Sequence, residues 1–296
     1  MRRVAITGAS GFIGRALSAS LKADGVSVVR IGRGAGSDVQ WDPAAGRLDA
    51  SALEGVEAVI HLAGASIAER WTAERKRVIR ESRVQGTRLI AERCARLATR
   101  PAVLVCASAI GIYASRGDEW LDETSSPGDD FLAGVVRDWE AAAEPARAAG
   151  IRVVHVRTGI ALNPRGGALG KMLLPFQLGV GGRLGSGRQW MSWISLEDLV
   201  RVFRFAMETP AISGPMNATA PEPVTNRTFA STLARVLKRP ALVPVPTFAL
   251  RALLGEMAEG TVLASQRVRA TVLAGAGFQF EHPTLSTALR SELDLR

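Results

Sequence analysis

The sequence is poor in the residues that mark several protein classes. It holds two cysteines among 296 residues, Cys94 and Cys106, and their spacing matches no metal-ligand motif. We therefore expect no disulfide framework, no metal site and a reducing compartment, the cytoplasm. No apolar run approaches the roughly 18 residues of a membrane span. The N-terminus also lacks the basic flank and apolar stretch of a signal peptide, so we expect no membrane contact.

Lysine and tyrosine are scarce too. Only four of the 37 basic residues are lysine, and the chain has one tyrosine. The net charge of +9 is spread along the chain rather than gathered in one block, so we expect no nucleic-acid partner. The apolar content of 47% is ample for the core of one large α/β domain with a smaller appended region.

Short apolar runs alternate with longer amphipathic stretches over the first half of the chain. The runs that predict strands are Val4 to Thr7, Ser27 to Ile31, Ser37 to Trp41, Ala58 to Gly64, Pro101 to Ser108 and Arg152 to Arg157. Three stretches predict the main helices: the first ends near Ala23, the second runs from Thr72 to Leu97, and the third runs from Asp129 to Ala149. This alternation predicts an α/β fold, a doubly wound parallel sheet of the Rossmann type.

Beyond Thr158 the rhythm loosens into glycine-rich loops. We expect helices at Gly170 to Leu178, Leu196 to Met207 with Ser195 as N-cap, and Asn226 to Leu237, and a strand at Gln189 to Ile194. We assign residues 1–239 to the Rossmann-like domain, with substrate-side insertions at about 164–188. Residues 240–296 form a C-terminal cap region in this division.

Three glycines follow the first predicted strand. Gly8 permits a tight turn, Gly11 lets the main chain approach a ligand, and Gly14 lets the next helix pack closely. The N–H groups and the dipole at the start of that helix favour an anion such as a pyrophosphate. Within this strand-loop-helix context the spacing predicts dinucleotide binding by residues 8–14. The predicted contacts in this loop are Gly8, Ser10, Gly11, Phe12, Ile13 and Gly14.

The end of the second predicted strand indicates which dinucleotide binds. A carboxylate at this point usually bonds the ribose 2′-hydroxyl of NAD, whereas an arginine accommodates the 2′-phosphate of NADP. This chain has Arg30 and Arg33 there and no carboxylate, so we predict NADP(H) with Arg33 on the phosphate.

The fourth and fifth predicted strands end in small residues at the expected crevice. Leu62, Ala63 and Gly64 would let the cofactor lie against the main chain, whereas we interpret His61 as a core residue. Ser108 ends the fifth strand, and its hydroxyl would point toward the reacting carbon.

Several motifs together resemble one family. They are Thr7 to Gly14, His61 to Gly64, Ser108 to Tyr113, Arg157 to Gly159, Gly166 to Met172, Leu184 to Gln189, Trp193 to Asp198, Ser265 to Val268, Ala274 to Phe278 and His282 to Thr284. They look like the extended short-chain dehydrogenase/reductases, which include the nucleotide-sugar epimerases, and more narrowly like the atypical "epimerase family protein" branch. The resemblance covers essentially the whole chain. It implies that Arg157 contacts the cofactor, that Arg188 and Trp193 lie on the substrate side, and that the protein can be a homodimer. Trp193 equally fits a core position.

The chain departs from the superfamily at its acid-base pair. The reductases and epimerases use Tyr-x-x-x-Lys on one helix face, the tyrosine exchanging a proton and the lysine lowering the tyrosine pKa. Here Phe131 and Val135 occupy those positions, and neither side chain can titrate. The one tyrosine is Tyr113, and Lys171 follows a glycine pair at a predicted helix start, so either is a candidate for the proton. A solvated position for Lys171 is the alternative.

Three functions remain open. In the first, the chain is an NADP(H)-dependent oxidoreductase or epimerase-like enzyme, in which Ser108 orients a small carbonyl or sugar substrate and Tyr113 or Lys171 transfers the proton. Alternatively it is an inactive NADP(H)-binding sensor or scaffold, or a nucleotide-sugar binder without turnover. The substrate itself cannot be read from these motifs.

Overall fold

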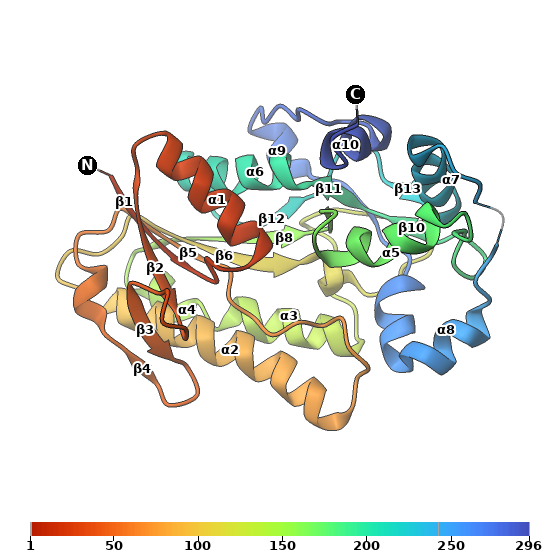
Figure 1. Ribbon diagram of the computed structural model, residues 1–296. Coiled ribbons are helices and arrows are strands. Elements are labelled where there is room, and N and C mark those ends of the chain that lie inside the picture. Colours follow the sequence, from red (N-terminus) through yellow and green to blue (C-terminus); the bar gives the residue numbers. More distant parts are fainter. Residues whose placement is uncertain (1, 242, 296) are drawn as a thin grey trace.

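The computed structural model describes residues 2–241 and 243–295. Its centre is one eight-stranded sheet with the order β12-β8-β6-β5-β1-β2-β3-β4 (Figure 1). Its strands are β1 Arg3–Thr7, β2 Ser27–Gly32, β3 Val39–Asp42, β4 Arg47–Leu48, β5 Ala58–His61, β6 Val103–Ala109, β8 Arg152–Thr158 and β12 Gly214–Ala218. Neighbours pair in parallel except β3 and β4, which are antiparallel. The strand order reverses between β1 and β5, the point at which such sheets bind ligands.

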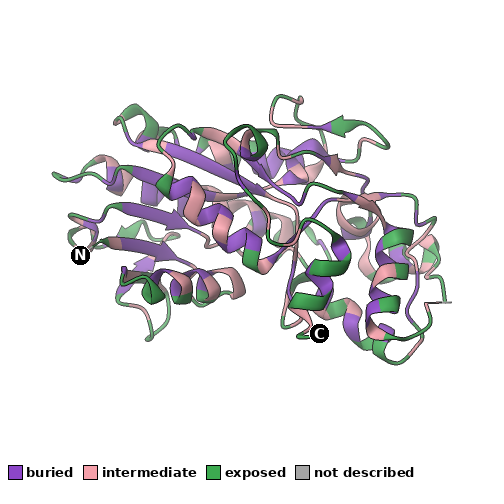
Figure 2. Ribbon diagram, turned by 90° about the horizontal axis from the view of Figure 1, so that it is seen from above, coloured by how far each residue is buried: buried purple, intermediate pink, exposed green. Residues whose placement is uncertain are grey.

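Helices cover both faces of this sheet. The helices over the two faces are α1 Phe12–Ala23 and α6 Leu196–Glu208 on one side, and α2 Ala73–Ala95, α3 Phe131–Ala141 and α4 Glu144–Ala148 on the other (Figure 1). Because successive strand residues point to opposite faces, they enter two separate cores. Val4 and Ile60 pack with Phe203 of α6, whereas Val59 packs with Ile90 of α2. Figure 2 shows the resulting burial along the central strands.

The remaining elements lie beyond the carboxyl edge of the sheet or close its margins. The helices here are α5 Gly167–Gln177, α7 Asn226–Leu237, α8 Thr247–Leu254, α9 Thr271–Gly275 and α10 Leu285–Glu292, with short turns η1 Ala50–Leu53, η2 Ile110–Tyr113 and the π-helix η3 Ala258–Val262. Three strand pairs complete the fold: β9 Ile160–Leu162 with β11 Trp193–Ser195, β10 Trp190–Met191 with β13 Val224–Thr225, and β7 Trp120–Leu121 with β14 Arg267–Val268.

Residues 240–296 contribute to more than one core. Leu273 and Phe278 join the core beneath α1 and α6, whereas Leu285 and Leu289 of α10 pack with residues of α5 and α7. The domain division at residue 239 stays a prediction from sequence. No helix in the described part of the chain is both long and apolar enough to cross a membrane.

Most predicted elements are confirmed, including the predicted α/β doubly wound sheet and the N-cap of α6, where the Ser195 hydroxyl accepts from the Asp198 N–H. The predicted helix from 129 to 149 is two helices, because Pro145 in the first turn of α4 lacks the N–H that a continuous helix needs. The predicted strand from 189 to 194 is likewise two short strands. Strand β12 escaped prediction because its sequence, Gly-Pro-Met-Asn-Ala, has no β-branched residue.

Candidate functional site

The first βα turn presents main-chain amides at the carboxyl edge of the sheet. Gly8 follows β1 with a φ of +68°, a conformation that glycine adopts without strain. Helix α1 begins after Gly11, and no side chain caps its first N–H groups. These N–H groups, together with the positive end of the helix dipole, can bind a phosphate.

Two close approaches explain why glycine stands at both ends of this turn. A Cβ on Gly14 would lie 2.7 Å from the Cα of Ala9, so α1 can pack on the turn only without a side chain there. A Cβ on Gly8 would lie 3.0 Å from the main-chain nitrogen of Ala63, in the segment after β5. The structure thus holds the turn between α1 and the end of β5.

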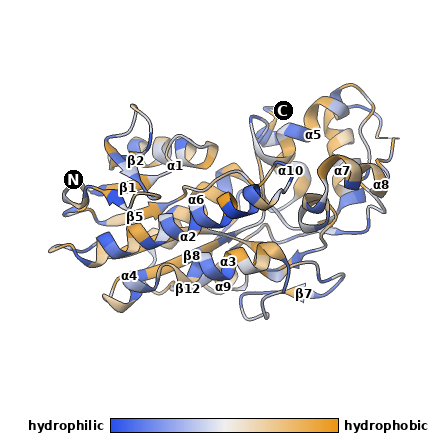
Figure 3. Ribbon diagram, turned by 90° about the horizontal axis from the view of Figure 1, so that it is seen from below, coloured by the Kyte–Doolittle hydropathy of each residue, from blue (hydrophilic) through white to orange (hydrophobic). Residues whose placement is uncertain are grey.

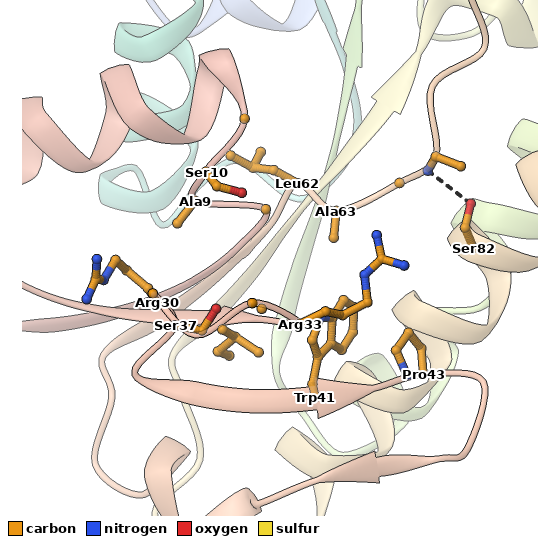
Figure 4. Close-up of a pocket in the computed structure, with 18 of the residues that line it drawn as sticks. Ala9, Ser10, Arg30, Arg33, Ser37, Trp41, Pro43, Leu62, Ala63 and Ser82 are labelled. Carbon is orange, nitrogen blue, oxygen red and sulfur yellow. Dashed lines mark hydrogen bonds between the residues drawn. The ribbon is translucent and has the colours of Figure 1, made fainter. Parts of the chain in front are cut away.

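A cavity of about 1050 Å³ lies beside this turn (Figure 4). The predicted cofactor residues that line it are Gly8, Ser10, Gly11, Arg33, Leu62, Ala63 and Gly64. Phe12, Ile13 and Gly14 form the first turn of α1 outside this lining, and Phe12 lies near Gly166 at the start of α5. The volume is at the upper end of the range for small-molecule sites.

The two arginines at the end of β2 have different surroundings. Arg30 binds Asp38 through two hydrogen bonds of 3.0 and 2.8 Å, and these bonds lower the pKa of Asp38 to about 2. Arg33 is exposed and forms no ion pair within the described residues. In Figure 4, Arg33 extends beside Trp41 toward Ala63, whereas Arg30 points away. Of these two arginines, Arg33 is therefore the one available to a ligand phosphate; Arg15 and Lys22 also line the cavity.

Arg83 lies beside Gly64, one of the residues that line the cavity, and the sequence did not reveal this position. Its side chain leaves α2 toward Gly64, where a Cβ would lie 3.4 Å from the guanidinium carbon. It donates to the Ile79 carbonyl at 3.0 Å and stacks on Trp139, 5.1 Å from the ring centroid. Burial, with a contribution from the charge of Arg75, lowers its pKa to about 10. No carboxylate within the described residues pairs with it, so an anionic ligand group would offset the cost of its burial.

Ser108 and Tyr113 belong to one buried network. The Ser108 hydroxyl donates to Glu140 at 2.6 Å, and Arg157 donates twice to the same carboxylate, at 2.9 Å each. Arg157 also donates to the Tyr113 hydroxyl at 3.1 Å, which in turn donates to Asn217 at 2.8 Å. The structure thus brings Ser108 and Tyr113 near each other, through Glu140 and Arg157, in the interior.

Charge in this network is balanced within the protein. Burial opposes ionisation of Glu140, but the hydrogen bonds and charge of Arg157 outweigh it and keep the Glu140 pKa below its ordinary value. Burial raises the pKa of Tyr113, despite the nearby guanidinium. Arg157, which the resemblance predicts to contact the cofactor, donates three hydrogen bonds within the protein, two to Glu140 and one to Tyr113.

The two helix positions that carry Tyr and Lys in the superfamily lie in an apolar cluster. Val135 is buried with Trp71, Ile79 and Met257, and Phe131 packs edge-on against Trp71 with ring centroids 5.1 Å apart. Neither position places a titratable side chain on this face of α3.

The other predicted site residues are separated from that network. Lys171 is exposed on α5, and its Nζ donates to the Ala68 carbonyl at 2.8 Å in the segment after β5. Arg188 is exposed, whereas Trp193 is fully buried and donates to the Glu222 carbonyl at 3.0 Å, a core position that leaves it no surface for a substrate. Within residues 2–241 and 243–295 no three His, Cys, Asp or Glu side chains are grouped as metal ligands.

The first βα turn, with glycine at both ends, lies where the strand order of a doubly wound sheet reverses, and a cavity lies beside it. This arrangement defines a Rossmann-type protein of the dinucleotide-binding class. Residues 4–218 match the model of the NAD dependent epimerase/dehydratase family, and residues 245–292 match a domain of unknown function, DUF1731. The chain belongs to the NAD dependent epimerase/dehydratase family.

Similar proteins cover nearly its whole length. The chain is 45% identical to epimerase family protein Mb2239 of Mycobacterium bovis, over 97% of this chain and 96% of that protein. It is 38% identical to epimerase family protein YfhF of Bacillus subtilis, with the same coverage. A crystal structure of human epimerase family protein SDR39U1 (isoform 2) with NADPH matches with a TM-score of 0.91 at 33% identity, over 99% of both chains. The resemblance to the "epimerase family protein" branch is confirmed.

Proposed function

We propose that the cavity binds NADP(H) and that the chain is an NADP(H)-dependent oxidoreductase or epimerase-like enzyme acting on a small carbonyl or sugar substrate. The observation that carries the cofactor assignment is that Arg33, just after β2, is exposed and, among the described residues, unpaired. The neighbouring Arg30 is instead held in an ion pair with Asp38. The NADPH named with the structure of the human relative supports it.

Each part of the cavity has a complementary part of the dinucleotide. The amides at the start of α1 would hold the pyrophosphate, Arg33 the 2′-phosphate, and the Leu62 to Gly64 segment would flank the nicotinamide half. Arg83, next to Gly64, would bind an anionic or hydroxyl group of the ligand on that side. A bound reduced nicotinamide supplies a hydride, so the protein's own task is to bind, to orient and to move a proton.

Lys171 is the predicted catalytic residue that a substrate can reach from solvent, because Ser108 and Tyr113 are buried. We propose Lys171 as the proton-handling group. Ser108 and Tyr113 would act through the Glu140–Arg157 network by fixing the ends of β6 and β8.

A sensor or scaffold that binds NADP(H) without turnover is the second candidate. The side chains of Phe131 and Val135 favour it, since neither can exchange a proton where the superfamily has an acid-base pair, and the Lys76 ammonium that lies 4.8 Å from the centre of the Phe131 ring is paired with Glu256. A cytoplasmic location and a homodimer stay predictions from sequence.

Calorimetric titration of NADPH and NADH tests the cofactor proposal. Arg33→Ala is expected to weaken NADPH binding by roughly 10- to 100-fold, the equivalent of one hydrogen-bonded charge, and to leave NADH binding unchanged. Arg290→Ala, an exposed arginine of α10, is the matched control. Unchanged NADPH affinity in Arg33→Ala overturns the assignment.

NADPH oxidation against a carbonyl library separates the enzyme from the sensor. Turnover that falls in Lys171→Met supports the enzyme. Tight NADPH binding without turnover of any carbonyl supports the sensor.

A further inference from the structure

Arg83 is a cation for which the described residues supply no carboxylate partner. Three carboxylates of α2 and α3 are paired with other arginines: Glu81 with Arg77, Asp138 with Arg80 and Glu140 with Arg157. Burial lowers the pKa of Arg83 only to about 10, so the side chain keeps its charge at neutral pH. Because a largely buried charge is costly without a polar partner, this position indicates a ligand group that accepts hydrogen bonds from it.

The fold brings Arg83 to the part of α3 where the superfamily has its lysine. Helices α2 and α3 lie side by side over one face of the sheet (Figure 1 and Figure 3), and Ile79 of α2 packs in one apolar cluster with Val135 of α3. One turn further along each helix, the Arg83 guanidinium stacks on Trp139. The guanidinium donates to the Ile79 carbonyl at 3.0 Å, so the side chain turns back toward the turn that packs with Val135. Arg83 thus supplies a positive charge from α2 beside the position at which α3 has none.

Arg83 also contacts the segment after β5 that lines the cavity. A Cβ on Gly64 would lie 3.4 Å from the guanidinium carbon and 3.6 Å from Nε of Arg83. Gly64 lines the cavity, as do Ser82 and Gln85, which lie on either side of Arg83 in α2. The Ser82 hydroxyl accepts from the Ala65 N–H at 3.1 Å and so fixes this segment to α2 (Figure 4). The guanidinium therefore lies at the margin of the cavity, beside Gly64.

The free donors of Arg83 match a pair of neighbouring hydroxyl groups. A guanidinium has five N–H donors, and toward the described residues Arg83 donates only from Nη1, to Ile79. In the proposed function the start of α1 holds the pyrophosphate and Arg33 holds the 2′-phosphate, so other groups already bind the phosphates. The ribose of the nicotinamide half carries two adjacent hydroxyl oxygens, and the planar fork of a guanidinium can donate to both at once.

We propose that Arg83 binds the two hydroxyl groups of the nicotinamide ribose and so replaces the lysine that this chain lacks at Val135. This rests on the proposed function and deepens it, because it names the residue that fixes the nicotinamide half. The replacement concerns the cofactor alone. Phe131 occupies the place of the tyrosine, so the charge of Arg83 activates no proton donor there.

Calorimetric titration of three ligands isolates this contact. They are NADPH, 2′-phospho-ADP-ribose, which keeps the second ribose without nicotinamide, and 2′-phospho-ADP, which lacks that ribose. We expect Arg83→Gln to weaken the first two by about tenfold and to leave the third unchanged. Arg88→Gln, at an exposed arginine of the same helix, is the matched control and should bind all three ligands like the wild type. A thermal melt shows that each variant is folded.

A double variant tests the place of the charge. Adding Val135→Lys to Arg83→Gln puts an ammonium on α3, with the space of the removed guanidinium beside it. We expect the double variant to bind NADPH at least about threefold more tightly than Arg83→Gln does. A folded double variant without this gain overturns the replacement of the lysine. If the melt shows that the double variant is unfolded, the titrations of the single variant decide.

Three results with folded Arg83→Gln would also overturn the proposal. Unchanged NADPH affinity would show that the guanidinium does not bind the cofactor. Equal weakening of 2′-phospho-ADP would assign its effect to the phosphates, and weakening of NADPH alone would assign it to the nicotinamide ring. A wild-type protein that binds none of the three ligands would instead refute the proposed function, so the two failures are distinguishable.

Discussion

Replacing Gly14 with alanine tests the glycine turn directly. The new Cβ would lie 2.7 Å from the Cα of Ala9 and 3.0 Å from its carbonyl carbon. Favourable carbon-carbon separations begin at about 3.5 Å, so α1 must move away from the turn by roughly 0.5–1 Å. That movement withdraws amides from the pyrophosphate. Losing two hydrogen bonds to a charged group, at roughly 1.5–3 kcal/mol each, weakens NADPH binding by about 10²- to 10⁴-fold.

The assay is calorimetric titration of NADPH, with a thermal melt to show that the variant is folded. Overpacking of about 1–3 kcal/mol should lower the Tm by only about 2–5 °C in a chain of this length. Gly275→Ala is the matched control, because its Cβ would meet no atom within 4 Å. If folded Gly14→Ala binds NADPH within about threefold of the wild type, the turn does not hold the pyrophosphate as described.

Other variants and conditions test the interior and Arg83. Glu140→Gln leaves Arg157 buried without a carboxylate and should cost about 3–5 kcal/mol, or about 5–8 °C in Tm by calorimetry; an unchanged Tm would contradict the network. Burial lowers the pKa of His61 and of His155 from 6.5 to about 4, so each binds its proton more readily when the chain is unfolded. Their contribution to stability is therefore complete above pH 6.5 and lost as the pH falls toward 4, and urea unfolding midpoints that stay constant over this range would refute it. Arg83→Gln should weaken NADPH and NADH binding equally, by about tenfold in calorimetry, and a loss confined to NADPH would show that Arg83 acts on the 2′-phosphate instead.

The glycine turn could be predicted because a short stretch of neighbouring residues forms it. Gly8, Gly11 and Gly14 follow a strand and start a helix, and both elements are visible as local patterns. The same holds for the absence of Tyr-x-x-x-Lys at Phe131 and Val135, since four-residue spacing fixes a helix face. The sequence could not show that Asp38 forms an ion pair with Arg30, because such a pair depends on the directions in which the two side chains point.

The buried network could not be predicted at all. Tyr113 meets Asn217 across 104 residues, and Ser108 meets Glu140 across 32. No regular spacing in the sequence links these residues. The position of Arg83 could not be predicted either. It is one of several arginines on a long helix, and only the fold places it against Gly64 and Trp139.

Sequence by itself determined the alternation of strands and helices, the glycine turn that begins α1 and the absence of the usual acid-base pair, because each depends on neighbours within a few residues. Tertiary structure alone decided which of the two arginines at the end of β2 is free of an ion pair among the described residues, and which polar groups neutralise one another in the interior. Those outcomes depend on contacts between distant segments, and burial sets the cost of every unpaired charge among them.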